Sequence, residues 1–159
     1  MNEVKTILVT SHDHDQFGLA ASMFEENGYR VIFERDVQQS VKIAKAELPN
    51  LIISELAVPD IDGPRFCRSV RENTALERTP IVLVGDLSRR SSIVRDSLRS
   101  GASDYLQKPF DPIELFDLCQ NAESGEARVN YRSSTSQRPD APIENFGSWA
   151  IVKDLICVN

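Results

Sequence analysis

The chain has 159 residues, enough for one domain and an appendage, and its 41% hydrophobic and 26% charged residues are ordinary for a globular protein. A net charge of -6 disfavours nucleic acid and anionic membranes as partners, because an acidic surface repels phosphate. The three cysteines show no CxxC spacing, which indicates reduced thiols in a cytoplasmic protein. We find no signal peptide pattern and no apolar run of about 18 residues, so no membrane partner is expected.

Five short apolar segments are predicted to be β-strands, and the amphipathic segments between them to be helices. The strands are expected at residues 6–10, 29–33, 51–54, 81–84 and 104–106. The first, third and fourth are nearly continuous in Ile, Leu and Val, which is typical of strands buried on both faces of a parallel sheet.

The helix boundaries follow from residues that start or stop helices. The first helix contains Phe17 to Phe24 and stops at Gly28. The next four are expected to be capped at their N-termini by Asp36, Asp62, Ser88 and Asp111. This alternation predicts an α/β fold with a doubly wound parallel sheet and helices on both faces. In such folds the functional site lies outside the carboxyl ends of the strands.

The C-terminal part has a different composition from the rest of the chain. Residues 1–123 are predicted to form the domain, and residues 124–145 are polar and rich in Ser, Arg and Pro, as in a linker or flexible tail. Residues 146–159 are apolar again, with Trp149, Val152 and Ile156 at helical spacing. This segment either docks on the domain, begins a further domain or binds a partner as a peptide.

The stretch TSHDHDQ after the first strand contains two histidines and two aspartates in alternation. His12 and His14 match the start of the HxHxDH zinc-binding pattern of metallo-β-lactamases, but the next required Asp and His fall on Gln16 and Phe17. Because the chain has only two histidines, zinc would lack its usual nitrogen and sulfur ligands. No metal site is predicted, and both histidines are interpreted as exposed loop residues.

Two other kinds of site in this loop, a phosphatase site and a flavin mononucleotide site, are disfavoured by the residues present. A phosphatase of the haloacid dehalogenase type would use Asp13 and Asp15 directly after the strand, whereas Ser11 and His12 intervene here. A flavin mononucleotide site would need a loop of glycines and small hydroxyl residues whose backbone N–H groups bind phosphate. The carboxylates of this loop would instead repel that phosphate.

Three stretches together resemble the receiver domain of bacterial response regulators, which act in two-component signalling and phosphorelays. They are ILVTSHD, LIISELAVPDIDG and GASDYLQKPFDPIEL, within residues 4–122. The resemblance implies a flavodoxin-like fold with five parallel strands in the order 2-1-3-4-5 and helices on both faces.

In this family an acidic pair after the first strand and an aspartate ending the third strand hold Mg²⁺, and that aspartate accepts a phosphoryl group. A Thr or Ser after the fourth strand and a Lys after the fifth bind the phosphoryl oxygens. By the resemblance, these positions fall on Ser11 and His12, Glu55, Gly85 and Lys108. Only the lysine is kept, and Tyr105 falls on the family's aromatic switch position.

These departures predict the loss of phosphotransfer. Imidazole is a poor ligand for Mg²⁺, and Asp13 lies one residue too far along the chain. The carboxylate of Glu55 extends about 1.5 Å further than that of aspartate, and such a displacement is costly for in-line transfer. Gly85 has no hydroxyl to bind a phosphoryl oxygen. Without the acidic pair we expect no Mg²⁺ binding, and no other cofactor is predicted. Glu55 either imitates the phosphorylated state by pairing with Lys108 or is a structural substitute, and both alternatives stay open.

The predicted function is therefore that of a phosphorylation-independent pseudo-receiver, a non-enzymatic regulatory module that acts through protein–protein interaction. By resemblance, the partner surface is helix four, strand five and helix five, within residues 88–121, with a homodimer as one form of the contact. Tyr105 is expected near its centre and Arg89, Arg90 and Arg95 at its rim. The alternatives are a receiver that still accepts a phosphoryl group on Glu55 or a neighbouring acid with Mg²⁺, and a sensor that binds a small ligand in the vacated pocket.

Overall fold

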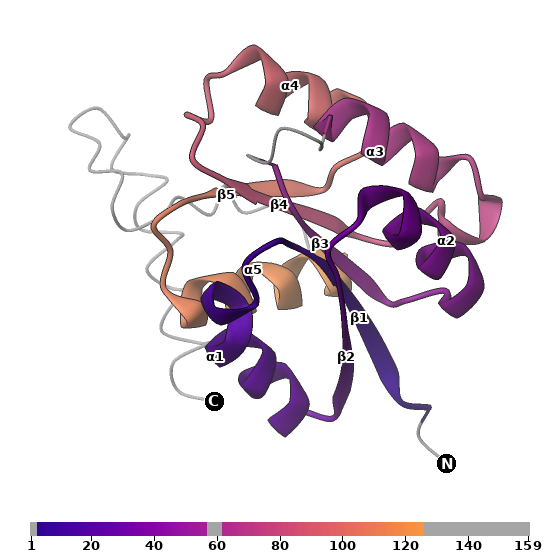
Figure 1. Cartoon of the computed structure of the whole chain (residues 1–159), viewed down its shortest axis with the longest axis vertical. Coiled ribbons are helices and arrows are strands. Elements are labelled where there is room, and N and C mark those ends of the chain that lie inside the picture. Colours follow the sequence, from indigo (N-terminus) through magenta and orange to yellow (C-terminus); the bar gives the residue numbers. More distant parts are fainter. Residues whose placement is uncertain (1–2, 57–61, 126–159) are drawn as a thin grey trace.

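The computed structural model describes residues 3–56 and 62–125, which form one parallel five-stranded sheet in the order β2-β1-β3-β4-β5 (Figure 1). The strands are β1 (Lys5–Thr10), β2 (Tyr29–Glu34), β3 (Leu51–Glu55), β4 (Ile81–Gly85) and β5 (Asp104–Gln107). The predicted fold class and strand order are confirmed, and each strand is one residue longer than predicted.

Helices cover both faces of the sheet. They are α1 (His14–Glu26), α2 (Val37–Glu47), α3 (Gly63–Arg71), α4 (Ser92–Arg99) and α5 (Pro112–Ser124), with a short 3₁₀ turn, η1 (Thr74–Leu76). Two buried clusters result, because successive strand residues point to opposite faces. Ile7 and Val9 pack with Phe17 and Leu115 under α1 and α5, whereas Leu8 packs in the cluster under α2, α3 and α4.

Aspartates cap the helices largely as predicted. The side chains of Asp36 and Asp62 accept hydrogen bonds from backbone N–H groups three residues further on, and Asp111 forms a capping box with Glu114. The first helix ends before Gly28, whose φ of 88° lies in the left-handed region that glycine tolerates best.

The prediction that Ser88 caps the fourth helix is wrong, because Ser91 does so. The Ser88 carbonyl accepts a hydrogen bond from Ser91 N at 2.8 Å, so residues 88–91 form a turn before the helix. Within this turn the Arg89 guanidinium donates to the backbone oxygen of Tyr105 and pairs with Asp104, each at 2.7 Å. These contacts hold the turn against β5, and the helix begins only after it.

The start of α3 packs tightly against α4 and against the residue that follows Glu55. A Cβ atom added to Gly63 would collide with the side chain of Leu56 and come within 2.5 Å of Ser97 Oγ. Glycine at this position therefore allows α3 to begin directly beside the end of β3.

The predicted linker at residues 124–145 lies outside the described residues apart from Ser124 and Gly125, and the predicted apolar segment at residues 146–159 lies outside them entirely. The same holds for residues 57–61 in the expected loop after β3. Among the helices that the structure describes, none has the length and apolar character needed to span a membrane.

Candidate functional site

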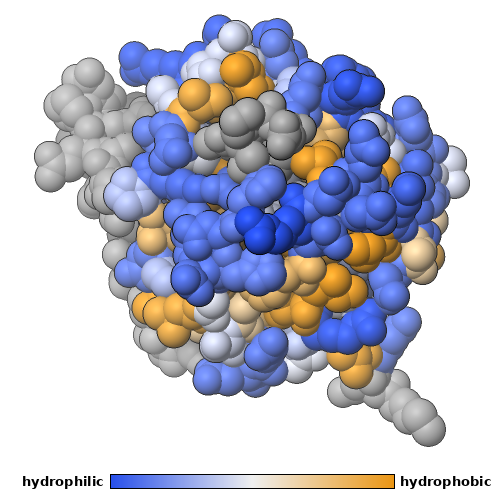
Figure 2. Space-filling view, viewed as in Figure 1, coloured by the Kyte–Doolittle hydropathy of each residue, from blue (hydrophilic) through white to orange (hydrophobic). Residues whose placement is uncertain are grey.

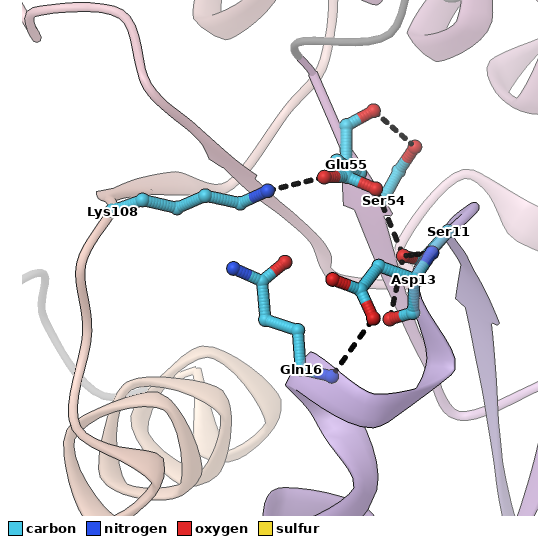
Figure 3. Close-up of polar contacts among 6 residues, drawn as sticks. All are labelled: Ser11, Asp13, Gln16, Ser54, Glu55 and Lys108. Atoms are coloured by element: carbon cyan, nitrogen blue, oxygen red, sulfur yellow. Dashed lines mark hydrogen bonds and ion pairs between the residues drawn. The ribbon is translucent and has the colours of Figure 1, made fainter.

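The carboxyl ends of four strands bring the predicted site residues to one edge of the sheet. Ser11 follows β1, Glu55 and Gly85 end β3 and β4, and Lys108 follows β5. In-register pairing of Thr10 with Ser54 holds the ends of β1 and β3 level. Figure 3 shows the Lys108 side chain extending across this edge towards Glu55.

Glu55 is the centre of the site, and both of its carboxylate oxygens have partners. Oε1 accepts a hydrogen bond from Lys108 Nζ in an ion pair, and Oε2 accepts one from Ser11 Oγ at 2.8 Å (Figure 3). The Glu55 and Lys108 side chains are only 8% and 12% exposed. The predicted reach of Glu55 to Lys108 is confirmed, and the pair is largely shielded from water.

The surroundings of Glu55 favour its ionised form. Burial by itself would raise its pKa. Hydrogen bonds from Lys108, Ser11 and the backbone of His12, together with the charge of Lys108, outweigh burial and hold the pKa below the ordinary value of 4.5. Glu55 is therefore a fixed anion at neutral pH.

Ser11 links this anion to the start of α1. Its buried hydroxyl accepts a hydrogen bond from Asp13 N at 2.9 Å while donating to Glu55. Asp13 in turn is the N-cap of α1, since its Oδ1 accepts from Gln16 N at 3.2 Å. The structure thus brings Ser11 to the site directly, whereas Asp13 is engaged in holding the helix end.

The two histidines do not converge on a common point. His12 is exposed in the loop, and His14 is the first residue of α1, with its ring centroid 4.6 Å from that of Phe33. Within residues 3–56 and 62–125, no three His, Cys, Asp or Glu side chains are grouped so that they would hold a metal ion.

Gly85 contributes its backbone to the site. Its carbonyl accepts a hydrogen bond from Lys108 N at 2.7 Å, which fixes the lysine beside the end of β4. The Lys108–Pro109 peptide bond is cis. Gly85 therefore positions Lys108, and the side-chain hydroxyl that the family places here has no counterpart.

Tyr105 was expected near the centre of the partner surface, but its side chain lies in the core and not on the surface. The side chain is buried, and its hydroxyl donates to the carbonyl of Leu87 at 2.5 Å. Burial and the nearby charge of Asp86 raise the pKa of Tyr105 to about 12. The hydroxyl therefore stays protonated and holds the segment between β4 and α4 against β5.

The three predicted rim arginines separate into two kinds. Arg89 is tied to Asp104 and to the backbone of Tyr105, so it belongs to the anchored turn before α4. Arg90 and Arg95 are exposed, and neither forms an ion pair with the part of the chain that the structure describes. The structure brings only Arg89 to Tyr105.

The sequence interpretation missed Gln16. Its side chain points from α1 towards the interval between Lys108 and Glu55, and its Oε1 is buried without a hydrogen-bond partner among the described residues (Figure 3). The spacing of Asp13 and Gln16 matches the Asp-x-x-Gln form of a helix N-terminus, and this signal would have placed Gln16 in the first turn of α1.

Sequence comparison identifies relatives over nearly the whole described region. Residues 3–120 match the family model of the response regulator receiver domain. The chain is 35% identical over 114 residues to an uncharacterised 14.6 kDa protein of Leptolyngbya boryana, covering 72% of this chain and 86% of the relative. It is also 35% identical over 120 residues to the probable transcriptional regulator ycf27 of Porphyridium aerugineum, covering 76% of this chain but only 47% of that relative.

Solved structures show the same architecture. The chemotaxis response regulator CheY4 of Vibrio cholerae superposes with a TM-score of 0.68 at 22% identity, covering 76% of this chain and 99% of that one. The receiver domain of the sensor histidine kinase PA1611 of Pseudomonas aeruginosa, with magnesium in its active-site cleft, gives a TM-score of 0.66 at 25% identity, covering 77% and 99%. The fold, the matched model and these relatives place the chain in the response regulator receiver domain family of two-component signalling.

Proposed function

We propose that this protein is a phosphorylation-independent receiver, a pseudo-receiver that regulates through contact with another protein and performs no enzymatic reaction. The observation that carries the proposal is the engagement of Glu55, whose two oxygens are taken by Lys108 and Ser11. In the family, an aspartate at the end of the third strand must be free to attack a phosphoryl donor. Here the side chain at that place is longer and already paired.

The donor set of the site does not fit Mg²⁺. This ion requires several oxygen ligands in near-octahedral geometry. The loop after β1 offers the Ser11 hydroxyl, which is committed to Glu55, and the exposed imidazole of His12, while Asp13 caps α1. The buried carboxylate of Glu55 is paired through Oε1 with the ammonium group of Lys108. Since phosphotransfer in the family depends on that metal, the proposal includes no phosphoryl step.

The conformation beside the site supports a module with one fixed state. The Tyr105 hydroxyl and the Arg89 guanidinium together fasten the segment between β4 and α4 to β5. A partner surface built on α4, β5 and α5 would then be presented in the same form whether or not a signal arrives. Both roles of Glu55, imitation of a phosphorylated aspartate and structural replacement of it, are compatible with such a fixed state.

The test is to incubate the full chain with Mg²⁺ and a small acyl phosphate, and to measure the intact mass. We expect no increment of one phosphoryl group, while a receiver that has the family's aspartate, run in parallel, gains one. The Glu55→Gln variant is the matched control. A stoichiometric increment in the wild-type chain that is missing from this variant would show that Glu55 accepts phosphate, and the proposal would be wrong.

The sensor alternative requires room between Ser11, Glu55, Gly85 and Lys108. The ion pair of Glu55 with Lys108 bridges this interval, so no specific contact favours a ligand there. The sensor and the cytoplasmic location stay predictions from the sequence. A thermal-shift screen with nucleotides and metabolites checks the sensor, because a ligand that binds only the folded state raises the melting temperature.

A further inference from the structure

The sheet separates helices of opposite charge. On one side, α1 and α5 together contain six acidic residues and no lysine or arginine; the acidic residues are Asp15, Glu25, Glu26, Glu114, Asp117 and Glu123. On the other side, α3 and α4 contain five arginines and a single acidic residue; the charged residues are Arg65, Arg68, Arg71, Arg95, Arg99 and Asp96. Within residues 3–56 and 62–125 of a protein with a net charge of -6, the helices thus place an excess of arginine on one side of the sheet and an excess of carboxylates on the other.

The basic face is defined here as the exposed surface of α3 and α4 with the turn before α4. Its basic and apolar residues are Arg65, Arg68, Arg90, Ile93, Arg95 and Arg99, and it also contains Asp96, which pairs with Arg99 at 3.7 Å. The two helices lie side by side, and Arg68 reaches across to Ser100 Oγ at 3.1 Å (Figure 1). Arg65, Arg90 and Arg95 have no ion-pair partner in the described ranges, and Ile93 is 47% exposed beside them. Figure 2 shows a mostly hydrophilic surface over α3 and α4 with separate apolar areas in it.

The acidic face is the outer surface of α1 and α5. Its residues are Asp15, Leu19, Glu25, Glu26, Ile113 and Asp117. Leu19 is 65% exposed and Ile113 is 58% exposed, so this face combines negative charge with apolar side chains. The carboxylates and apolar side chains of the acidic face are therefore complementary to the arginines and Ile93 of the basic face.

We propose that the basic face of one copy binds the acidic face of a second copy of this chain. Arginine suits such a contact, because its planar guanidinium pairs with a carboxylate through two hydrogen bonds. The exposed apolar residues of both faces would be removed from water in the contact, which adds to its stability. This self-association goes beyond the proposed function and does not depend on whether Glu55 accepts a phosphoryl group.

The placement of the faces determines the form of the assembly. They lie on opposite sides of the sheet, so the contact is heterologous, and it continues into a ring or a linear chain of copies. The helices of the acidic face have 13 residues each and are about 20 Å long, whereas α3 and α4 have 9 and 8 residues and are about 12–14 Å long. Because the shorter pair limits the contact, we expect an interface at the low end of the size range for specific interfaces and therefore a weak, reversible contact. Nucleic acid is the less suitable occupant, since the rest of the molecule is acidic and repels phosphate.

The experiment is sedimentation of the full 159-residue chain over micromolar to near-millimolar concentrations. At low salt, we expect the average mass of the wild-type chain to rise with concentration. At about 1 M salt, where the screening length is about 3 Å, it should return to that of the monomer. A wild-type chain that stays monomeric at low salt over the whole range would overturn the proposal.

Variants in which the charged side chains of one face are replaced by uncharged ones test whether that face takes part in the contact. One variant carries Arg65→Gln, Arg68→Gln and Arg95→Gln, and the other carries Glu25→Gln, Glu26→Gln and Asp117→Asn. Each should be monomeric where the wild-type chain is associated. Their equimolar mixture should form dimers and nothing larger, because each variant keeps one intact face. A mixture that stays monomeric would contradict the proposed contact.

A control for the arginine variant carries Arg35→Gln, Lys45→Gln and Arg78→Gln, which make the net charge more negative by the same three units but lie outside both faces. It should associate like the wild-type chain. Equal loss in this control, or association that survives in every variant, would assign the effect to net charge or to residues 126–159 and overturn the proposal. Binding of a short duplex DNA to the basic face of a chain that remains monomeric would do the same.

Discussion

Glu55 and Lys108 form a largely buried ion pair, and removing the charge of one partner leaves the other without compensation. Breaking a buried pair in this way typically costs about 3–5 kcal/mol. Because Lys108 retains some contact with water, we expect Glu55→Gln to lower the free energy of unfolding by about 3 kcal/mol, near the bottom of that range. Urea denaturation measures the change.

The exposed pair of Arg30 with Glu47 provides the control for this prediction. These side chains are 53% and 44% exposed, and surface pairs contribute at most about 1 kcal/mol. Glu47→Gln should therefore change the stability much less than Glu55→Gln. Similar effects of the two substitutions would mean that the Glu55 pair is not shielded in solution.

The pH dependence of stability follows from the same carboxylate. Folding lowers the pKa of Glu55, so in acid the unfolded chain binds this proton more readily than the folded chain does. The stabilising contribution is complete above the ordinary pKa of 4.5 and is lost as the pH falls through the folded-state value. The stability gap between the wild-type chain and Glu55→Gln should be constant near neutral pH and narrow below about 4.5. A gap that stays the same down to strongly acidic pH would contradict this assignment.

At the scale of elements, the packing of α3 against α4 depends on the absence of a side chain at Gly63. We expect Gly63→Ala to destabilise the fold by about 1–3 kcal/mol, because the added methyl group must displace Leu56 and Ser97. Gly18 is the matched control, since it lies within α1 and a Cβ there meets nothing within 4 Å. Gly18→Ala should stabilise by up to about 1 kcal/mol through helix propensity. Thermal unfolding of both variants distinguishes packing from propensity.

The elements and the site were predictable from the sequence to different degrees. Continuous apolar runs and capping aspartates locate the strands and most helices, because these signals are local. The pairing of Glu55 with Lys108 follows from the meeting of parallel strand ends at one edge of the sheet. The start of α4 was not predictable, since Ser88 and Ser91 are equally good caps and contacts of Arg89 with β5 decide between them. Nor does the position of Tyr105 in a strand reveal that its hydroxyl is satisfied by a carbonyl 18 residues away.

For the whole molecule, a network at the end of the sheet opposite the site joins the first strands to the last helix. Glu123 near the end of α5 pairs with Lys5 at 2.6 Å and accepts a hydrogen bond from the Tyr29 hydroxyl at 2.6 Å. Gln120 donates to the same hydroxyl at 3.0 Å. These contacts connect β1 and β2 with α5, so the domain is closed by residues that precede Gly125.

A chain that ends at Gly125 should therefore fold with the stability of the full chain. We expect the same urea midpoint and the same dependence on denaturant for both lengths, because the slope reports the surface exposed on unfolding. Within the short chain, Tyr29→Phe removes two hydrogen bonds and leaves the ring in place, and it should cost about 1–2 kcal/mol. A short chain that is clearly less stable, or that has a smaller slope, would show that residues 126–159 belong to the folded unit.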